Sequence, residues 1–244
     1  MSVIDKFIKY RQNKDTFCSA VIVAAGNSQR MGKDKILMPI NGKPVIAYTL
    51  EAFQNSDCID EIIVVTKLDN LAVIADICNE YGITKTSKVV CGGKCRAESS
   101  LAGIQSVSED AGLIAIHDGA RPFVSSRVIE RCVTAAEENS AAAPAVFATD
   151  TVRILNKKGV VASTPDRDLV APIQTPQVFE ASLIKTALEK AVEKQLPITD
   201  DCSAVEAMGV KVSIVGGEPD NIKLTTARDV YIAEKIIEER NEVK

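Results

Sequence analysis

The chain has 244 residues, a formal net charge of −4 and ordinary globular shares of hydrophobic (46%) and charged (25%) residues. The acidic charge, the 4% of aromatic residues and the absence of tryptophan argue against nucleic acid as a partner, because such partners are bound by basic surfaces and aromatic stacking platforms. A small anionic ligand stays open, since a local cluster of cations can bind it whatever the net charge.

The chain begins with 17 residues that lack the apolar core of a signal peptide. We therefore expect a short N-terminal extension over residues 1–17 and a single domain over residues 18–244. Apolar runs stay below the ~18 residues of a membrane span, so no membrane partner is expected. The seven cysteines are scattered, odd in number and without a CxxC pair, which favours a reducing, cytoplasmic location.

Short apolar runs rich in β-branched residues alternate with amphipathic helical patterns through the first 150 residues. Strands are predicted at 19–25, 61–66, 88–91, 113–118 and 143–148, and helices at 44–54, 70–82, 97–107 and 125–138. Pro44 suits a first helical turn, Gly82 a helix end, and Ser125 or Ser126 an N-cap. This alternation predicts an α/β fold, a Rossmann-like three-layer sandwich with a mostly parallel sheet.

The pattern changes after residue 150. Residues 150–172 read as an extended β-arm, with residues 157–159 forming a turn between 151–155 and 160–164. A two-stranded ribbon is marginally stable alone, so we expect it to pack on something, such as a second subunit. Helices are predicted at 180–194, 199–209 (with Thr199 as N-cap) and 226–240, and a strand at 211–215.

The first candidate binding loop follows the first strand, as "AAGNSQRMG". It is neither a Walker A sequence nor the GxGxxG fingerprint, but its small residues Ala24, Ala25 and Gly26 allow a ligand to approach the backbone. Arg30 adds a planar fork of donors and Lys35 a mobile charge, which together suit a polyphosphate. The alternative is a solvated surface loop that carries cations.

The second candidate is "CGGKCRAESS", where Gly92 and Gly93 follow a strand and Arg96 and Ser99 enter a helix. A glycine pair admits a flat ligand, and a helix N-terminus favours anions. A plain Gly-Gly turn is the alternative. Cys91 and Cys95 flank this loop, but structural zinc needs four ligands and the chain offers no further pair.

The third and fourth candidates are "HDGARPF" and "EPDNIKLTT". Asp118 ends a strand and suits Mg²⁺, which prefers oxygen ligands beside substrate phosphates. Asp220 and Lys223 precede the last helix. As alternatives, Asp118 is a turn or capping residue and the other two lie on the surface. His117 fits a packed ring better than a catalyst.

Seven motifs in order give a resemblance over residues from about 18 to 240. They are AAGxSxRMG with a following lysine, GGxxRAxS, HDGARPF, DTVR, QTPQVF, ITDDCSAVE and DNIKLTT. The chain resembles the 2-C-methyl-D-erythritol 4-phosphate cytidylyltransferases of the non-mevalonate isoprenoid pathway. The resemblance implies that CTP and a sugar-alcohol phosphate react, with Mg²⁺ as cofactor, to give 4-diphosphocytidyl-2-C-methyl-D-erythritol and pyrophosphate.

The resemblance also implies a role for individual residues. The catalytic cations would be Arg30, Lys35 and Lys223. The CTP-binding residues would be Ala24, Ala25, Gly26, Gly92, Gly93, Arg96, Ser99 and Gly119. The acceptor would meet Asp118, Arg121 and Thr199 and, reaching across a homodimer from the arm, Thr151 and Arg167. The metal ligands would be Asp118 and Asp220.

Two features of this chain depart from the family pattern. Ile36 and Leu37 stand where a glutamine and an aromatic residue are common, and Lys94 and Cys95 occupy a variable position beside the base pocket.

Three rival functions are the alternatives to this one. A ribitol-5-phosphate cytidylyltransferase shares the scaffold, and a Rossmann oxidoreductase would need GxGxxG. A non-catalytic nucleotide-binding regulator would not need the lysines and carboxylates together.

Overall fold

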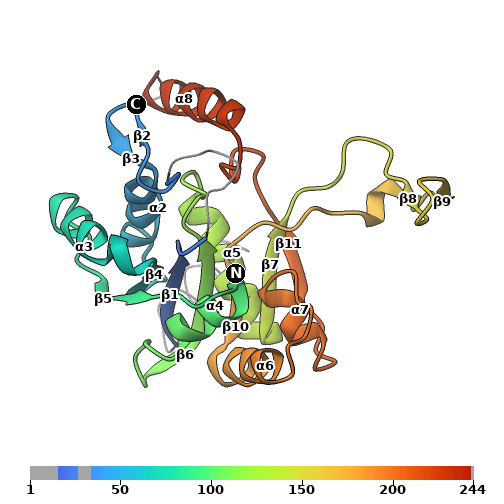
Figure 1. The fold of residues 1–244 in the computed structure, drawn as a ribbon, viewed down its shortest axis with the longest axis horizontal. Coiled ribbons are helices and arrows are strands. Elements are labelled where there is room, and N and C mark those ends of the chain that lie inside the picture. Colours follow the sequence, from blue (N-terminus) through green and yellow to red (C-terminus); the bar gives the residue numbers. More distant parts are fainter. Residues whose placement is uncertain (1–15, 27–33, 243–244) are drawn as a thin grey trace, which may run out of the picture.

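The computed structural model of the chain describes residues 16–26 and 34–242 (Figure 1). Its centre is a seven-stranded sheet with the order β11-β7-β10-β6-β1-β4-β5. The strands are β1 (Phe17–Val23), β4 (Glu61–Thr66), β5 (Thr86–Cys91), β6 (Ala111–Asp118), β7 (Ala141–Ala145), β10 (Gln177–Glu180) and β11 (Ser213–Gly216). All run in one direction except β10, which is antiparallel to β6 and β7. The predicted mostly parallel α/β fold is confirmed.

Helices cover both faces of this sheet. One core contains side chains from α2 (Val45–Gln54), α3 (Leu71–Glu80) and α5 (Ser126–Asn139). The other contains side chains from α4 (Arg96–Ile104), α6 (Ala181–Glu193) and α7 (Asp201–Glu206). In β1, Ala20 and Ile22 enter the first core and Val21 the second. Both faces are therefore buried, which is why the strands read as continuous apolar runs rather than alternating ones.

A third, smaller core lies beside the sheet. The closing helix α8 (Ala227–Glu242) packs with the short hairpin of β2 (Pro39–Ile40) and β3 (Lys43–Pro44). Ile40, Phe123 and Ile236 meet there, and Leu224 joins them fully buried. The C-terminal helix and the residues before it are thus fastened to the segment that follows the first loop.

Several predicted helix ends are confirmed, and two need correction. Ser125 caps α5, and its side chain accepts a hydrogen bond from Val128 N. Gly82 follows α3 with a positive φ of 65°, as a C′ residue often does. Pro44 is not the first helical residue but the N-cap of α2, because it still pairs within the hairpin.

Thr199 was predicted to cap α7, and this is wrong. The cap is Asp200, whose side chain accepts from Ser203 N while Ser203 Oγ bonds back to the cap's backbone. The sequence places three suitable capping residues close together, and the register of this capping box decides between them.

Two strand predictions also need correction. The strand predicted at 143–148 is β7 at 141–145, since Val146 N and Ala148 N bond instead to the returning arm at Pro172 O and Val170 O. Strand β10 was not predicted as a strand of the main sheet. It is only four residues long, and it is inserted between two strands that are distant in sequence.

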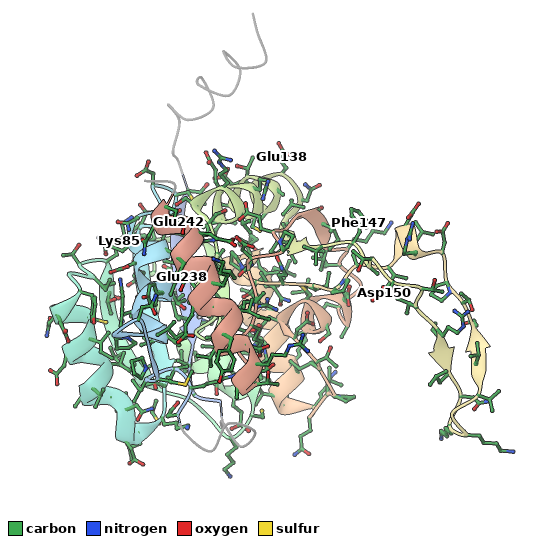
Figure 2. All side chains as sticks on the ribbon, turned by 90° about the horizontal axis from the view of Figure 1, so that it is seen from above. Lys85, Glu138, Phe147, Asp150, Glu238 and Glu242 are labelled. Atoms are coloured by element: carbon green, nitrogen blue, oxygen red, sulfur yellow. The ribbon has the colours of Figure 1, made fainter. Side chains whose placement is uncertain are left out.

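The arm extends away from the body of the molecule (Figure 1). At its tip, β8 (Ile154–Leu155) pairs antiparallel with β9 (Val161–Ser163), and the short helix η2 (Arg167–Leu169) follows. The predicted ribbon is confirmed, although its strands are shorter than expected. Phe147 and Asp150 lie where the arm leaves the body (Figure 2). Among the described residues, no helix is both long and apolar enough to cross a membrane.

Candidate active site at the carboxyl ends of the strands

The candidate loops meet at one edge of the sheet. The register places Val23, the last residue of β1, beside Asp118, the last residue of β6. Gly119 N donates to Val23 O at 2.9 Å, and Ala24 N donates to Val65 O at 2.7 Å. The carboxyl ends of parallel strands are where ligands bind in open α/β sheets, so the loops are correctly placed for a site.

The small residues of these loops pack on one another. A side chain at Gly119 would bring its Cβ within 3.0 Å of Ala24 Cβ, and one at Gly92 would lie within 2.9 Å of Ser99 Oγ. Protein neighbours therefore already require glycine at both positions. Gly26 differs, because no atom of the described residues lies within 4 Å of a Cβ built there. Its place beside a ligand stays a prediction.

Asp118 is the centre of the charged cluster in the described structure. Its Oδ1 accepts from Arg96 Nη1 at 2.5 Å. Its Oδ2 lies 2.8 Å from Lys223 Nζ and 3.6 Å from Arg121 Nε. These cations come from three separate segments of the chain, namely the start of α4, the loop after β6 and the segment before α8. The sequence predicted all four residues as site residues, and the structure brings them together.

The electrostatics follow from this pairing. Burial alone would raise the pKa of Asp118, but Arg96 and Lys223 outweigh it and hold that pKa well below its usual range. Burial alone would lower the pKa of Arg96, but the charges of Asp201 and Asp118 raise it above the ordinary value. Asp118 is therefore ionised and Arg96 charged at neutral pH.

Asp201 is a member of the cluster that sequence reasoning missed. Its Oδ2 accepts from Arg96 Nη2 at 2.6 Å, and the residue has no solvent exposure. Gln177 on β10 accepts from the backbone nitrogens of Asp201 and Cys202, both at 3.0 Å. The signal in the sequence is the Asp200-Asp201 doublet, since a helix needs only one cap and the second carboxylate is free for another role.

Lys35 joins this site from the other end of the chain. Its Nζ donates to Leu224 O at 3.1 Å, immediately after Lys223. Leu224 N in turn donates to Ala120 O at 2.9 Å, which fastens the same segment to the loop after β6. Two lysines separated by most of the sequence thus lie at one place. Arg30 lies outside the described residues.

A hydrogen-bonded network of His117, Thr175 and Asn221 holds Arg121 of the cluster in place. Arg121 Nη1 donates to Asn221 O at 2.6 Å, and Asn221 Nδ2 donates to Thr175 O at 2.9 Å. Thr175 Oγ1 bonds His117 Nδ1 at 2.9 Å, and His117 Nε2 lies 3.1 Å from Arg121 O. Thr175 and Asn221 were not predicted, because only the tertiary fold shows that polar side chains there are buried.

His117 is fully buried within that network. Burial lowers its pKa to about 4, which outweighs the opposing hydrogen bond with Arg121 O and the charge of Asp118. The ring is therefore neutral at pH 7, and both of its nitrogens are occupied by protein groups. This agrees with the prediction that His117 is a packed ring.

The second loop is anchored by Ser99. Its Oγ accepts from Gly93 N at 3.2 Å and donates to Cys95 O at 2.9 Å. The loop is thereby folded over the start of α4, beside Arg96. Ile36, one of the residues that depart from the family pattern, is buried in the core beneath the site.

The remaining predicted residues lie apart from Asp118 or contact other groups. Thr151 and Arg167 are exposed on the arm, where Arg167 Nη1 donates to Thr149 O at 3.4 Å. Thr199 is exposed ahead of α7, and its backbone nitrogen donates to Ser203 Oγ. The Asp220 carboxylate lies 4.0 Å from Arg240.

The two predicted metal ligands do not fit a magnesium ion held by the protein. Both oxygens of Asp118 already receive cations, and Asp220 has an arginine as its ionic partner. Within residues 16–26 and 34–242, no three acidic, histidine or cysteine side chains gather closely enough to bind a metal. A site that supplies cations to its central carboxylate instead suits an anionic ligand.

Comparisons with known proteins agree with this geometry. The family model for 2-C-methyl-D-erythritol 4-phosphate cytidylyltransferase matches residues 18–239. A protein of that name from Clostridium botulinum (strain ATCC 19397 / Type A) is 40% identical over 222 residues, which are 90% of this chain and 97% of the relative. Another, from Caldanaerobacter subterraneus subsp. tengcongensis, is 43% identical over 219 residues, 88% of this chain and 96% of the relative.

A solved structure is similar as well. The crystal structure of 4-diphosphocytidyl-2C-methyl-D-erythritol synthase from Anaerococcus prevotii superposes with a TM-score of 0.83 at 34% identity, covering 91% of this chain and 96% of that one. On the family match and these relatives together, the chain belongs to the 2-C-methyl-D-erythritol 4-phosphate cytidylyltransferase family.

Proposed function

We propose that the cluster around Asp118 is the reaction centre of this cytidylyltransferase. As an enzyme of its family, the chain converts CTP and 2-C-methyl-D-erythritol 4-phosphate to 4-diphosphocytidyl-2-C-methyl-D-erythritol and pyrophosphate, in isoprenoid precursor biosynthesis. The observation that carries the assignment of the centre is the convergence of Arg96, Arg121 and Lys223 on the Asp118 carboxylate.

The charge balance of the cluster explains why it would bind phosphate. Three cations, Arg96, Arg121 and Lys223, surround two carboxylates, those of Asp118 and Asp201, so one positive charge is left over. Lys35 adds a second positive charge beside Lys223. The carboxylates hold the cations in fixed positions, and the surplus charge attracts the phosphates of the substrates.

The chemistry requires charge stabilisation more than proton transfer. An oxygen of the acceptor phosphate attacks the α-phosphorus of CTP, a new P–O bond forms, and the bond to the bridging oxygen of the β-phosphate breaks to release pyrophosphate. The attacking phosphate is already ionised, so no general base is needed. Fixed cations that meet the developing negative charge provide most of the catalysis in such transfers.

Within this proposal, Lys35 and Lys223 serve as catalytic cations together with Arg30. The loop residues Ala24, Ala25, Gly26, Gly92, Gly93, Ser99 and Gly119 border CTP, with Arg96 at their inner end. Asp118, Arg121 and Thr199 contact the acceptor. For the described residues at the ends of β1, β5 and β6, the support is their common position at the carboxyl edge of the sheet, whereas the roles of Arg30 and Thr199 rest on the family resemblance.

The arm is proposed to complete the site in a homodimer. Many of its apolar side chains are exposed, although a ribbon of this kind is marginal alone. The exposed apolar side chains of the arm include Ile154, Leu155, Val160, Val161 and Leu169. A second copy would cover them and would receive Thr151 and Arg167 beside its acceptor.

Cytidylyltransferases commonly use divalent cations, and Mg²⁺ remains our proposal for this enzyme. The carboxylates described above do not fit it as protein ligands, so the ion would enter with CTP as part of the substrate. Phosphate oxygens are ligands that Mg²⁺ accepts readily. We likewise propose a single catalytic domain over residues 18–244 and a cytoplasmic location.

The deciding experiment measures pyrophosphate release from CTP with each of two acceptors. 2-C-methyl-D-erythritol 4-phosphate should support turnover, and ribitol 5-phosphate should give a much lower kcat/KM. Equal or greater turnover with ribitol 5-phosphate would overturn the acceptor assignment. Tight CTP binding without any pyrophosphate release would indicate a nucleotide-binding regulator instead.

A further inference from the structure

The Arg96 guanidinium is shared between two carboxylates that belong to different parts of the fold. Nη1 reaches Asp118 at the end of β6, and Nη2 reaches Asp201, the first residue of α7. A guanidinium fork more often grips one carboxylate with two parallel bonds. Here Asp118 accepts from one terminal nitrogen of Arg96 and Asp201 accepts from the other. The two carboxylates together therefore determine the orientation of the guanidinium plane.

Asp201 cannot itself reach a substrate, because it has no solvent exposure, whereas the Arg96 side chain is 28% exposed. The second oxygen of Asp201, Oδ1, is also buried and has no hydrogen-bond partner among the described residues. Within the described residues, the Asp201 carboxylate therefore bonds to Arg96 through Oδ2. Any effect of Asp201 on the reaction must pass through that arginine.

The position of Asp201 is fixed independently of the site. Gln177 accepts from its backbone nitrogen and donates to Asp200 Oδ2 at 2.7 Å, while Asp200 caps the helix. Gln177 lies on β10, which is paired with β6 and so with the strand that carries Asp118. Asp118 on β6 and Asp201, which is bonded to β10 through Gln177, are thus held by two neighbouring strands.

We propose that Asp201 is a positioning residue for Arg96 in the cytidylyl transfer. By taking Nη2, it prevents Arg96 from gripping both oxygens of Asp118, and so leaves Asp118 Oδ2 to Lys223 and Arg121. Loss of Asp201 lets the guanidinium rotate onto Asp118, which removes it from its place beside the second loop and loosens the Lys223 pair. This inference rests on the proposed function of the cluster.

The test is a pair of neutral, nearly isosteric substitutions, Asp201→Asn and Glu206→Gln. The matched control is Glu206→Gln rather than Asp200→Asn, because the Asp200 carboxylate helps to fix Asp201 through Gln177, whereas Glu206 is exposed at the other end of α7. Asp201→Asn and Glu206→Gln each remove one negative charge from α7. We expect kcat/KM for pyrophosphate release to fall about 10- to 100-fold in Asp201→Asn and to stay within about threefold of wild type in Glu206→Gln. Equal values for the two variants would overturn the proposal.

A double-mutant cycle with Arg96→Lys distinguishes positioning of Arg96 from a general structural role, because it measures whether the two losses in kcat/KM are independent. Lysine keeps the charge but cannot bridge two carboxylates. If Asp201 acts through Arg96, adding Asp201→Asn to Arg96→Lys should cost less than about twofold more, whereas independent effects would multiply. Multiplying losses would overturn the proposal.

Two controls keep the result interpretable. Should Asp201→Asn fail to fold, as judged by its thermal unfolding, Arg96→Lys alone still tests the shared fork, and wild-type turnover in that variant would refute it. A wild-type enzyme that releases no pyrophosphate would refute the proposed function. An active wild type with equal kcat/KM in Asp201→Asn and Glu206→Gln would refute only the role of Asp201.

Discussion

The cluster around Asp118 and the arm place polar and apolar groups in opposite ways. In the cluster, the carboxylates of Asp118 and Asp201 are buried, and each is paired with a positive charge. In the arm, which extends away from the body (Figure 2), apolar side chains are exposed, and Leu169 is 84% exposed. Burying charge costs free energy unless it is paired, and exposing apolar surface does so unless a partner covers it. The charge pairs of the first region form within one chain, whereas the apolar side chains of the second stay exposed in it.

The largest expected effect comes from removing a cation of the cluster. Lys35→Ala and Lys223→Ala should each lower kcat by about 10²–10³ or more, because a fixed charge beside the transferred phosphate is lost while the core is untouched. Steady-state pyrophosphate release measures this. Lys235→Ala on the exposed face of α8 is the matched control and should keep wild-type turnover. Near-normal turnover in the Lys35 variant would remove Lys35 from the catalytic set.

The buried support of the cluster should show itself in the pH dependence of stability. The pKa of His117 falls from 6.5 in the unfolded chain to about 4 in the folded one. Below pH 6.5 the unfolded chain therefore binds a proton that the folded chain does not, and lowering the pH destabilises the fold. On the order of 3 kcal/mol of the free energy of unfolding should be lost by pH 4 through this ring alone.

Urea unfolding between pH 7 and pH 4 tests this expectation. His117 is the only histidine in the chain, so a His117→Gln variant isolates its contribution. The variant should have a flatter pH dependence than wild type between pH 6.5 and pH 4. Parallel curves for the two proteins would mean that the titration of His117 is not what the pH change measures. The depressed pKa of Asp118 acts at lower pH, as the pH falls below the ordinary carboxylate range.

A substitution in the arm should change the dissociation constant of the dimer rather than the free energy of unfolding. Leu155→Asp places a charge among the apolar side chains proposed to face a second copy. It should weaken the dimer by about tenfold or more, equivalent to about 1.4 kcal/mol, while the unfolding of the body is unchanged. Sedimentation at several protein concentrations gives the dissociation constant. Lys157→Asp in the exposed turn is the control, and a monomeric wild type would contradict the proposed dimer.

The smallest effect compares two glycines with positive φ, one in each region. Gly82 ends α3 with φ of 65°, and Gly159 lies in the arm's turn with φ of 78°; nothing lies within 4 Å of a Cβ at either. Alanine should cost about 1 kcal/mol of local conformational energy at both positions. Urea unfolding should register that cost for Gly82→Ala and show almost none for Gly159→Ala. Equal losses would mean that the arm unfolds together with the body.

Much of the fold could be predicted because its signals are local. Continuous apolar runs identified the buried strands, and the cap at Ser125 and the glycine at 82 marked helix ends correctly. Strand β10 was missed because four residues carry too little pattern, and only pairing with β6 and β7 makes them a central strand. The misplaced cap at Thr199 has the same origin, since several adjacent residues satisfy the local rule.

The site shows the same division. Motifs and resemblance named Lys35, Arg96, Asp118, Arg121 and Lys223, and the structure places them together. The role of Asp201 could not be predicted, because an aspartate at the start of a helix normally faces water. The two metal ligands were proposed from their residue type, and the cations that occupy Asp118 are visible only in the fold.

The sequence by itself determined most of the strands and helices and the family to which the protein belongs. These properties depend on the residue types and backbone preferences of short stretches of the chain. The tertiary structure alone decided which charge pairs with which. Arg96 and Asp201 are 105 residues apart and Lys35 and Leu224 are 189 apart, and such distances are closed only when the two faces of the sheet are packed. Coulombic pairing depends on separation in space, and the order of residues along the chain does not contain it.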